Sequence, residues 1–121
     1  MKRHNKTVSC LKKWVFDNRE KPLSINSVIE KSGYSRRYME SVFRKLTGET
    51  IYSYIRAVQF SDAEKKLSKT NSKISEIAAT YGYRSLSQFT KTFIKIYGLS
   101  PSDYRRKARN EKSATIKIKK S

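Results

Sequence analysis

Apolar residues recur every three or four positions along most of this chain, the spacing of helices that bury one face. Gly, Pro and short polar stretches divide the pattern into about seven segments, so the sequence predicts an all-α fold. The expected helices cover about residues 7–18, 25–31, 36–46, 51–69, 74–80 and 85–97, and a seventh begins at Pro101.

The fourth expected helix has the longest uninterrupted pattern, because neither Gly nor Pro occurs between Glu49 and Asn71. At roughly 1.5 Å per residue, such a helix would span about 27 Å. We expect it to be a rigid connector between the parts of the chain before and after it.

Two stretches about fifty residues apart repeat the same residue types in the same order. The equivalent pairs are Ile25 and Ile74, Val28 and Ile77, Gly33 and Gly82, Phe43 and Phe93, Gly48 and Gly98, and Tyr54 and Tyr104. The offset grows from 49 to 50 just after Gly33 and Gly82, so the second copy has one inserted residue there.

Each copy contains a short amphipathic segment, a glycine and a second amphipathic segment, the order of a helix-turn-helix. Gly33 and Gly82 can take the positive φ that ends the first helix. Ser35 and Ser85 can cap the second helix by accepting from its free backbone amides. The sequence therefore predicts two helix-turn-helix subdomains.

The expected organisation has four parts: a first subdomain at 1–50, the connecting helix at 51–69, a second subdomain at 70–109 and a tail at 110–121. Cores of about 50 residues are marginal alone, which is why a rigid connection matters. The tail is basic and weakly patterned, so we expect it to be disordered.

The composition favours a nucleic-acid partner. Lys and Arg number 28 against 10 Asp and Glu, which gives a formal net charge of +18. Phosphate is the expected counter-charge. No apolar run approaches the roughly 18 residues of a membrane span, and no signal-peptide core follows Met1, so we expect a cytoplasmic protein without membrane contact.

Residues suited to catalysis or metal binding are scarce. Cys10 is the sole cysteine and His4 the sole histidine, and neither has a cluster of potential partners nearby in the sequence. We expect Cys10 to be a half-buried neighbour of the core and His4 a solvated residue in a flexible start. The sequence predicts no enzyme activity and no cofactor.

The second helix of the first copy has an apolar stripe of Met39, Val42, Phe43 and Leu46. Its opposite face and first turn carry the candidate DNA-binding residues Arg36, Arg37, Glu40, Ser41 and Arg44. Arg suits guanine and Glu suits cytosine N4, while Ser is adaptable. Arg44 is a better candidate for phosphate than for a base.

The second helix of the second copy has an apolar stripe of Phe89, Phe93 and Ile96. Its outward candidates are Ser87, Gln88, Lys91 and Lys95, and Arg56 in the connecting helix completes the DNA-binding set. Gln88 could pair with adenine, and the two lysines suit phosphate. A single basic helix face is usually only solvated surface; two such faces after equivalent turns favour DNA reading.

Residues 82–106, GYRSLSQFTKTFIKIYGLSPSDYRR, resemble the signature of the AraC/XylS family of bacterial transcription regulators. The resemblance covers about residues 7–106 and is nearest to the small, stand-alone members of the MarA and SoxS type. It implies a monomeric activator that places two helix-turn-helices in successive major-groove segments of promoter DNA and recruits RNA polymerase. The recognition helices would be 36–46 and 85–97.

The reading positions depart from that group. Arg37, Glu40 and Ser41 stand where Trp, Gln and Arg are usual, and Leu86 and Ser87 stand where paired glutamines are usual. In the connecting helix, Gln59 replaces a common Arg. The scaffold is retained while the reading residues differ, which indicates a different set of target sites.

The alternative is a sequence-neutral protein that coats or shapes nucleic acid, for which charge alone would suffice and the basic tail would be the active part. The ordered repeat argues against it, and affinity in the presence of salt and competitor DNA separates the two. The tyrosines fall mostly at turns and helix junctions, which favours packing over base stacking. No small-molecule ligand is evident, so control by protein abundance is the expectation.

Overall fold

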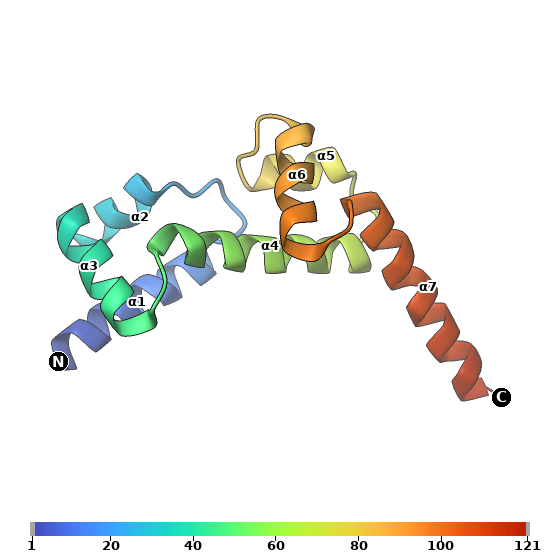
Figure 1. The fold of residues 1–121 in the computed structure, drawn as a ribbon, viewed down its shortest axis with the longest axis horizontal. Helices are drawn as coiled ribbons and strands as arrows, with labels where there is room; N and C mark the ends of the chain where they lie inside the picture. The colour runs from blue at the N-terminus through green and yellow to red at the C-terminus, as the bar shows by residue number, and fades with distance from the viewer. Residues whose placement is uncertain (1, 121) are drawn as a thin grey trace. The chain divides into compact units, whose positions relative to one another are not determined.

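The computed structural model describes the backbone of residues 2–120 and the side chains of residues 4–111. This part of the chain contains seven α-helices and no strand (Figure 1), which confirms the all-α fold. The helices are α1 (Lys2–Asp17), α2 (Ile25–Ser32), α3 (Arg36–Thr47), α4 (Ile51–Lys69), α5 (Ile74–Thr80), α6 (Leu86–Tyr97) and α7 (Pro101–Lys120). Helices α2 to α6 match the expected ranges to within one residue.

The chain divides into two compact units, an N-terminal unit of Met1–Ser61 and a C-terminal unit of Asp62–Ser121. The boundary lies inside α4, so each unit takes part of that helix into its own core. Each unit contains one helix-turn-helix, α2–α3 in the first and α5–α6 in the second.

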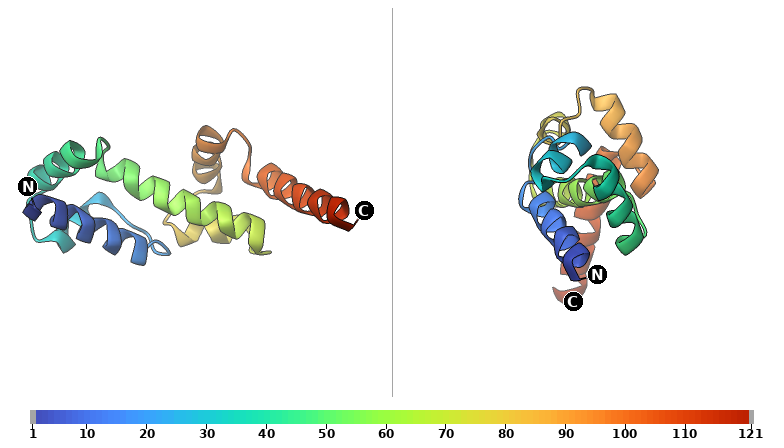
Figure 2. Two further views of the ribbon diagram at one scale, coloured as in Figure 1. Left: turned by 90° about the horizontal axis from the view of Figure 1, so that it is seen from below. Right: turned by 90° about the vertical axis from the view of Figure 1, so that its left-hand side faces the viewer.

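The core of the N-terminal unit forms where α1, α2, α3 and the start of α4 meet. Val15, Met39 and Phe43 are completely buried there, and Ile51 and Ile55 of α4 close the cluster. Figure 2 shows α1 running beside this first part of α4. The three helices of the subdomain therefore share one apolar core with the start of the connecting helix.

Gln59 is the one buried polar residue among the described side chains. Its amide nitrogen donates to the carbonyl oxygen of Lys21 at 2.7 Å and to that of Arg19 at 3.4 Å. Both carbonyls lie in the segment that follows α1. Gln59 thus fixes this segment against α4.

The core of the C-terminal unit is built around Phe89 and Phe93 of α6, which are completely buried. The ring of Phe93 packs against Tyr97 at 4.5 Å and edge-on against Tyr104 of α7 at 5.5 Å, measured between centroids. The Tyr104 hydroxyl donates to the Glu64 carboxylate. Burial, with the nearby Glu64 charge, raises the pKa of Tyr97 to about 12.

Two arginines of α7 hold the last turns of α4 and the segment between α4 and α5. Arg105 donates to the carbonyl oxygens of Leu67 at 2.8 Å and Ser72 at 2.7 Å. Arg109 donates to the Thr70 carbonyl at 3.0 Å and the Asn71 side-chain oxygen at 2.6 Å. These bonds fix the chain just before the second helix-turn-helix. The start of α5 itself has no side-chain cap.

Both ends of the chain differ from expectation. Helix α1 begins at Lys2 and includes His4, whose Nδ1 lies 2.7 Å from the Tyr38 hydroxyl, so His4 is not a solvated residue in a flexible start. The tail is not disordered through residue 120, because α7 continues to Lys120. Residues 107–120 contain neither Gly nor Pro and are rich in residue types with high helix propensity. Ser121 lies outside the described residues.

Two burial expectations were wrong. Ile96 is 42% exposed, because Tyr97, one position later, fills the place on the α6 stripe beside Phe93. Cys10 is exposed instead of half-buried. It lies one position before Leu11 on α1, and of these two neighbours Leu11 is the one that reaches the core.

We expect Arg105→Ala to lower the free energy of unfolding by about 1–3 kcal/mol, because it removes two hydrogen bonds from a charged donor to partly buried carbonyls. Urea unfolding followed by circular dichroism measures the loss. Arg106→Ala is the matched control: Arg106 is exposed and reaches only Asp103 at 3.7 Å, so its loss should be below about 0.5 kcal/mol. Equal losses in both variants would contradict a structural role for Arg105.

Candidate nucleic-acid interface

The turn of the first helix-turn-helix is closed by a glycine and a serine. Gly33 ends α2 in the left-handed conformation at φ 76°, and its N–H donates to the Glu30 carbonyl at 3.3 Å. No atom would obstruct a Cβ at this position, so the backbone angle, not space, requires glycine. Ser35 then starts α3 by accepting from the Tyr38 N–H at 3.2 Å.

The second turn repeats this arrangement with one more residue. Gly82 has φ 86°, and Ser85 caps α6 by accepting from the Gln88 N–H at 3.1 Å. One residue separates Gly33 from its serine, and two, Tyr83 and Arg84, separate Gly82 from its serine. The predicted insertion therefore lies in the turn itself, between the end of α5 and the cap of α6.

Helix α3 buries one face and exposes the other. With Met39 and Phe43 fully buried, the helical period places the predicted residues on the solvent side. All five are exposed: Arg36, Arg37, Glu40, Ser41 and Arg44. Lys45, in the last turn of the same helix, is exposed as well.

Two of these residues already have protein partners. Arg36 Nε lies 3.2 Å from the Glu40 carboxylate, an exposed pair one turn apart. Arg36 Nη1 also donates to the side-chain oxygen of Asn26 on α2 at 3.1 Å. Asn26 was missed in the sequence reading, because nothing in the spacing indicates that its amide reaches the first turn of α3. The network fixes Arg36 and partly neutralises Glu40.

Helix α6 has the same layout around Phe89 and Phe93. The four predicted residues Ser87, Gln88, Lys91 and Lys95 are all exposed, and the helix contains no acidic residue. Leu86, named above at a reading position, is 47% exposed, and Ile94, which the sequence analysis did not single out, is 43% exposed. An exposed aliphatic group on a recognition helix can contact the methyl group of thymine.

Arg56 stands apart from the other predicted residues. It lies on α4, outside both helix-turn-helices, and is half-buried with its guanidinium 5.5 Å from the centroid of the Tyr52 ring. The structure thus groups the remaining nine predicted residues into two sets, one on α3 and one on α6. Each set lies on the second helix of its own helix-turn-helix.

The charge of these surfaces suits an anionic partner. Helix α3 carries four basic residues against one acidic, and α6 carries two basic residues against none. Within the described residues, no group of three potential metal ligands occurs. No helix in residues 2–120 is long and apolar enough to cross a membrane.

Comparison with known proteins identifies the architecture. The profile of a helix-turn-helix domain family matches residues 28–107. The chain is 35% identical to the multiple antibiotic resistance protein MarA of Escherichia coli K12 over 99 residues, 82% of this chain and 78% of MarA. The chain belongs to the AraC/XylS family. It is also 36% identical to the regulatory protein SoxS of the same strain over 102 residues, covering 84% of this chain and 95% of SoxS.

The fold of the family agrees with the fold found here. One solved structure is the DNA-binding domain of AdpA in complex with a target DNA. This chain superimposes on that domain with a TM-score of 0.78 at 22% identity, covering 86% of this chain and 94% of that domain. Membership of this family makes the protein a sequence-specific, DNA-binding transcription regulator. The family consists of DNA-binding regulators, which are not enzymes.

Proposed function

We propose that this regulator binds one asymmetric promoter site as a monomer and inserts α3 and α6 into two successive segments of the major groove. The observation that supports the proposal is the presence, in one chain, of two complete helix-turn-helices, each with an exposed basic face on its second helix. A protein with both reading helices in one chain needs no partner copy to contact two groove segments.

We assign base reading to three exposed residues, Arg37 and Ser41 on α3 and Gln88 on α6. None of the three side chains has a competing partner among the described side chains. Arg suits guanine and Gln suits adenine through paired hydrogen bonds. To accept a hydrogen bond from cytosine N4, Glu40 would have to break its exposed ion pair with Arg36. The cost would be small, because such pairs contribute about 0–1 kcal/mol.

The remaining candidates would position the protein on the phosphate backbone. Arg44, Lys91 and Lys95 lie in the middle or last turn of their helices, where long cationic side chains more often meet phosphate than base edges. We add Arg36, held towards α2 by Asn26, and Arg56 to this set, and we assign Ser87 an adaptable role near the bases.

The site sequence should differ from those of the relatives. Arg37, Glu40 and Leu86 occupy positions at which bases are expected to be read, and their chemistry differs from the Trp, Gln and Gln usual at these positions in the MarA and SoxS group. We also propose that the bound protein activates transcription in the cytoplasm by contacting RNA polymerase. Reconstituted transcription with purified polymerase tests this step, and an unchanged transcript level on a promoter carrying the bound site would refute it.

A sequence-neutral nucleic-acid coat remains the second candidate, favoured by the net charge of +18. Competition separates the two functions. A specific complex should survive an excess of random-sequence duplex, whereas a coating complex should be lost on every sequence alike as salt or competitor is added.

The monomer proposal has a direct stoichiometric test. On a minimal duplex that retains full affinity, mass photometry or sedimentation should find one protein per DNA, because both recognition helices are supplied by one chain. Two copies on that duplex would contradict the proposal.

Base reading and phosphate contact can be separated by two substitutions that each remove one positive charge. Arg37→Ala should cost about 1–3 kcal/mol on the preferred duplex and much less on a scrambled one, because it removes a base contact. Gln88→Ala should behave in the same way. Lys95→Ala should weaken both duplexes alike and lower the salt slope by about one unit.

Fluorescence anisotropy titrations at several salt concentrations measure these effects. Arg37 would not be a base-reading residue if the ratio of specific to scrambled affinity were the same in Arg37→Ala and in the unmodified protein. Lys95 would be a reading residue, contrary to the assignment, if its substitution changed that ratio.

A further inference from the structure

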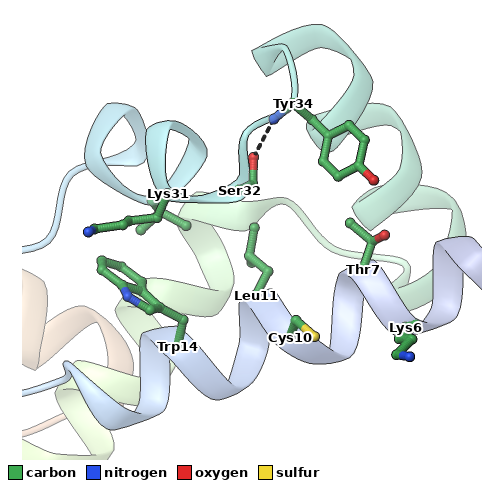
Figure 3. A pocket seen from close by; sticks show the side chains of 9 residues that line it. Lys6, Thr7, Cys10, Leu11, Trp14, Lys31, Ser32 and Tyr34 are labelled. Carbon is green, nitrogen blue, oxygen red and sulfur yellow. Dashed lines mark hydrogen bonds between the residues drawn. The ribbon is translucent and has the colours of Figure 1, made fainter.

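A pocket of about 480 Å³ opens in the N-terminal unit between α1, α2 and the turn that follows α2 (Figure 3). Leu11 of α1 and Val28 of α2 line its inner part. The Trp14 indole lies at one end in Figure 3 and the Tyr34 ring at the other. The volume falls in the range of small-molecule sites, roughly 300–1,000 Å³.

The lining offers ring surfaces to a ligand. Trp14 is half-buried, so one part of the indole is fixed by the core while the rest is accessible. Tyr34 is 43% exposed, although its ring packs at a tilt against Tyr38, with 4.9 Å between centroids. Aromatic side chains held in this way contribute large apolar contact areas and favour stacked or edge-on rings.

The charged groups of the pocket are all cationic. Its lining includes Lys6 and Lys31 and no acidic residue. In Figure 3, Lys31 extends above the indole, while Lys6 points outward from α1. The Ser32 hydroxyl is already engaged, donating to the Ile29 carbonyl at 2.6 Å and accepting from the Tyr34 N–H at 3.1 Å. Neither lysine has an ion-pair partner among the described side chains, so a ligand carboxylate would be their first.

We propose that this pocket binds an aromatic carboxylate, with the ring between Trp14 and Tyr34 and the carboxylate at Lys31. A protein partner fits less well: nine residues line the pocket, whereas a stable protein interface uses roughly 20–30 residues a side. The site lies against the turn of the first helix-turn-helix, because Ser32 and Tyr34 flank Gly33. The inference goes beyond the proposed function and does not depend on it, because binding is measured without DNA.

The chain contains its own reporters for the pocket. Trp14 is the only tryptophan and Cys10 the only cysteine, and both line the pocket. Phenylbutyrate is a suitable probe, with phenylbutyramide as its uncharged counterpart. We expect phenylbutyrate to change Trp14 fluorescence saturably and to slow alkylation of Cys10 by iodoacetamide with the same midpoint. The amide should bind more weakly, by about two- to fivefold, as for loss of one exposed charge pair.

Two variants and two matched controls locate the site. Cys10→Tyr places a ring in the pocket and should abolish the fluorescence response, whereas Ser9→Tyr, at an exposed neighbouring position outside the lining, should retain it. Lys31→Gln should lower the affinity for phenylbutyrate about as much as replacing the acid with the uncharged amide does. Lys13→Gln removes an equal charge from exposed α1 surface outside the lining and should have little effect. Circular dichroism confirms that each variant is folded.

Four results would overturn the proposal. The absence of a saturable response from both reporters means that the pocket does not take this class of ligand. A full response in folded Cys10→Tyr means that the ligand binds elsewhere. Equal weakening by Lys31→Gln and Lys13→Gln, or equal affinity for the acid and the amide, means that the overall charge or apolar contact governs binding, without a carboxylate site at Lys31.

Discussion

The complete burial of Phe43 and Phe93 is the constraint on which both recognition surfaces depend. Each phenylalanine lies at the centre of its unit's core, and a helix with one face fixed in this way has no freedom to rotate about its axis. The residues on the opposite face, among them Arg37 on α3 and Lys91 on α6, must then point to solvent. The exposure of the proposed DNA-binding side chains is therefore a consequence of core packing.

The two copies of the motif share this constraint but differ in what they present. On α3, Arg36 connects Glu40 to Asn26 of the preceding helix. On α6 no acidic residue is present, and the exposed surface includes Leu86 and Ile94. The second turn also has one residue more than the first. Two helices of such different chemistry are suited to different base sequences, which accords with an asymmetric site.

The sequence was sufficient for the features that depend on neighbouring residues. Helix ends follow from caps such as Ser35 and from Gly33, because these act on the backbone within one turn. The features it did not predict depend on distant elements meeting: Gln59 with the segment after α1, Arg105 with the segment before α5, and the pairing of His4 with Tyr38. No periodicity encodes such contacts.

The prediction that Ile96 belongs to the buried face of α6 was wrong for a related reason. Ile96 and Tyr97 both fall near the apolar face, and spacing alone does not choose between them. Tyr104 of α7 packs against both Phe93 and Tyr97, and the three rings form one aromatic cluster. For the candidate site, burial supports the division between core and surface residues on α3 and α6, whereas the partners of Arg36 and the pocket beside Trp14 required the three-dimensional structure.

The central claim is that two different reading helices in one chain select one asymmetric DNA sequence. Selection of bound duplexes from a random pool by the purified protein, followed by sequencing, tests it most directly. We expect an enriched, non-palindromic motif with two informative blocks whose centres are about one helical turn, roughly 10 base pairs, apart. An unenriched pool, a single block or a palindrome would contradict it.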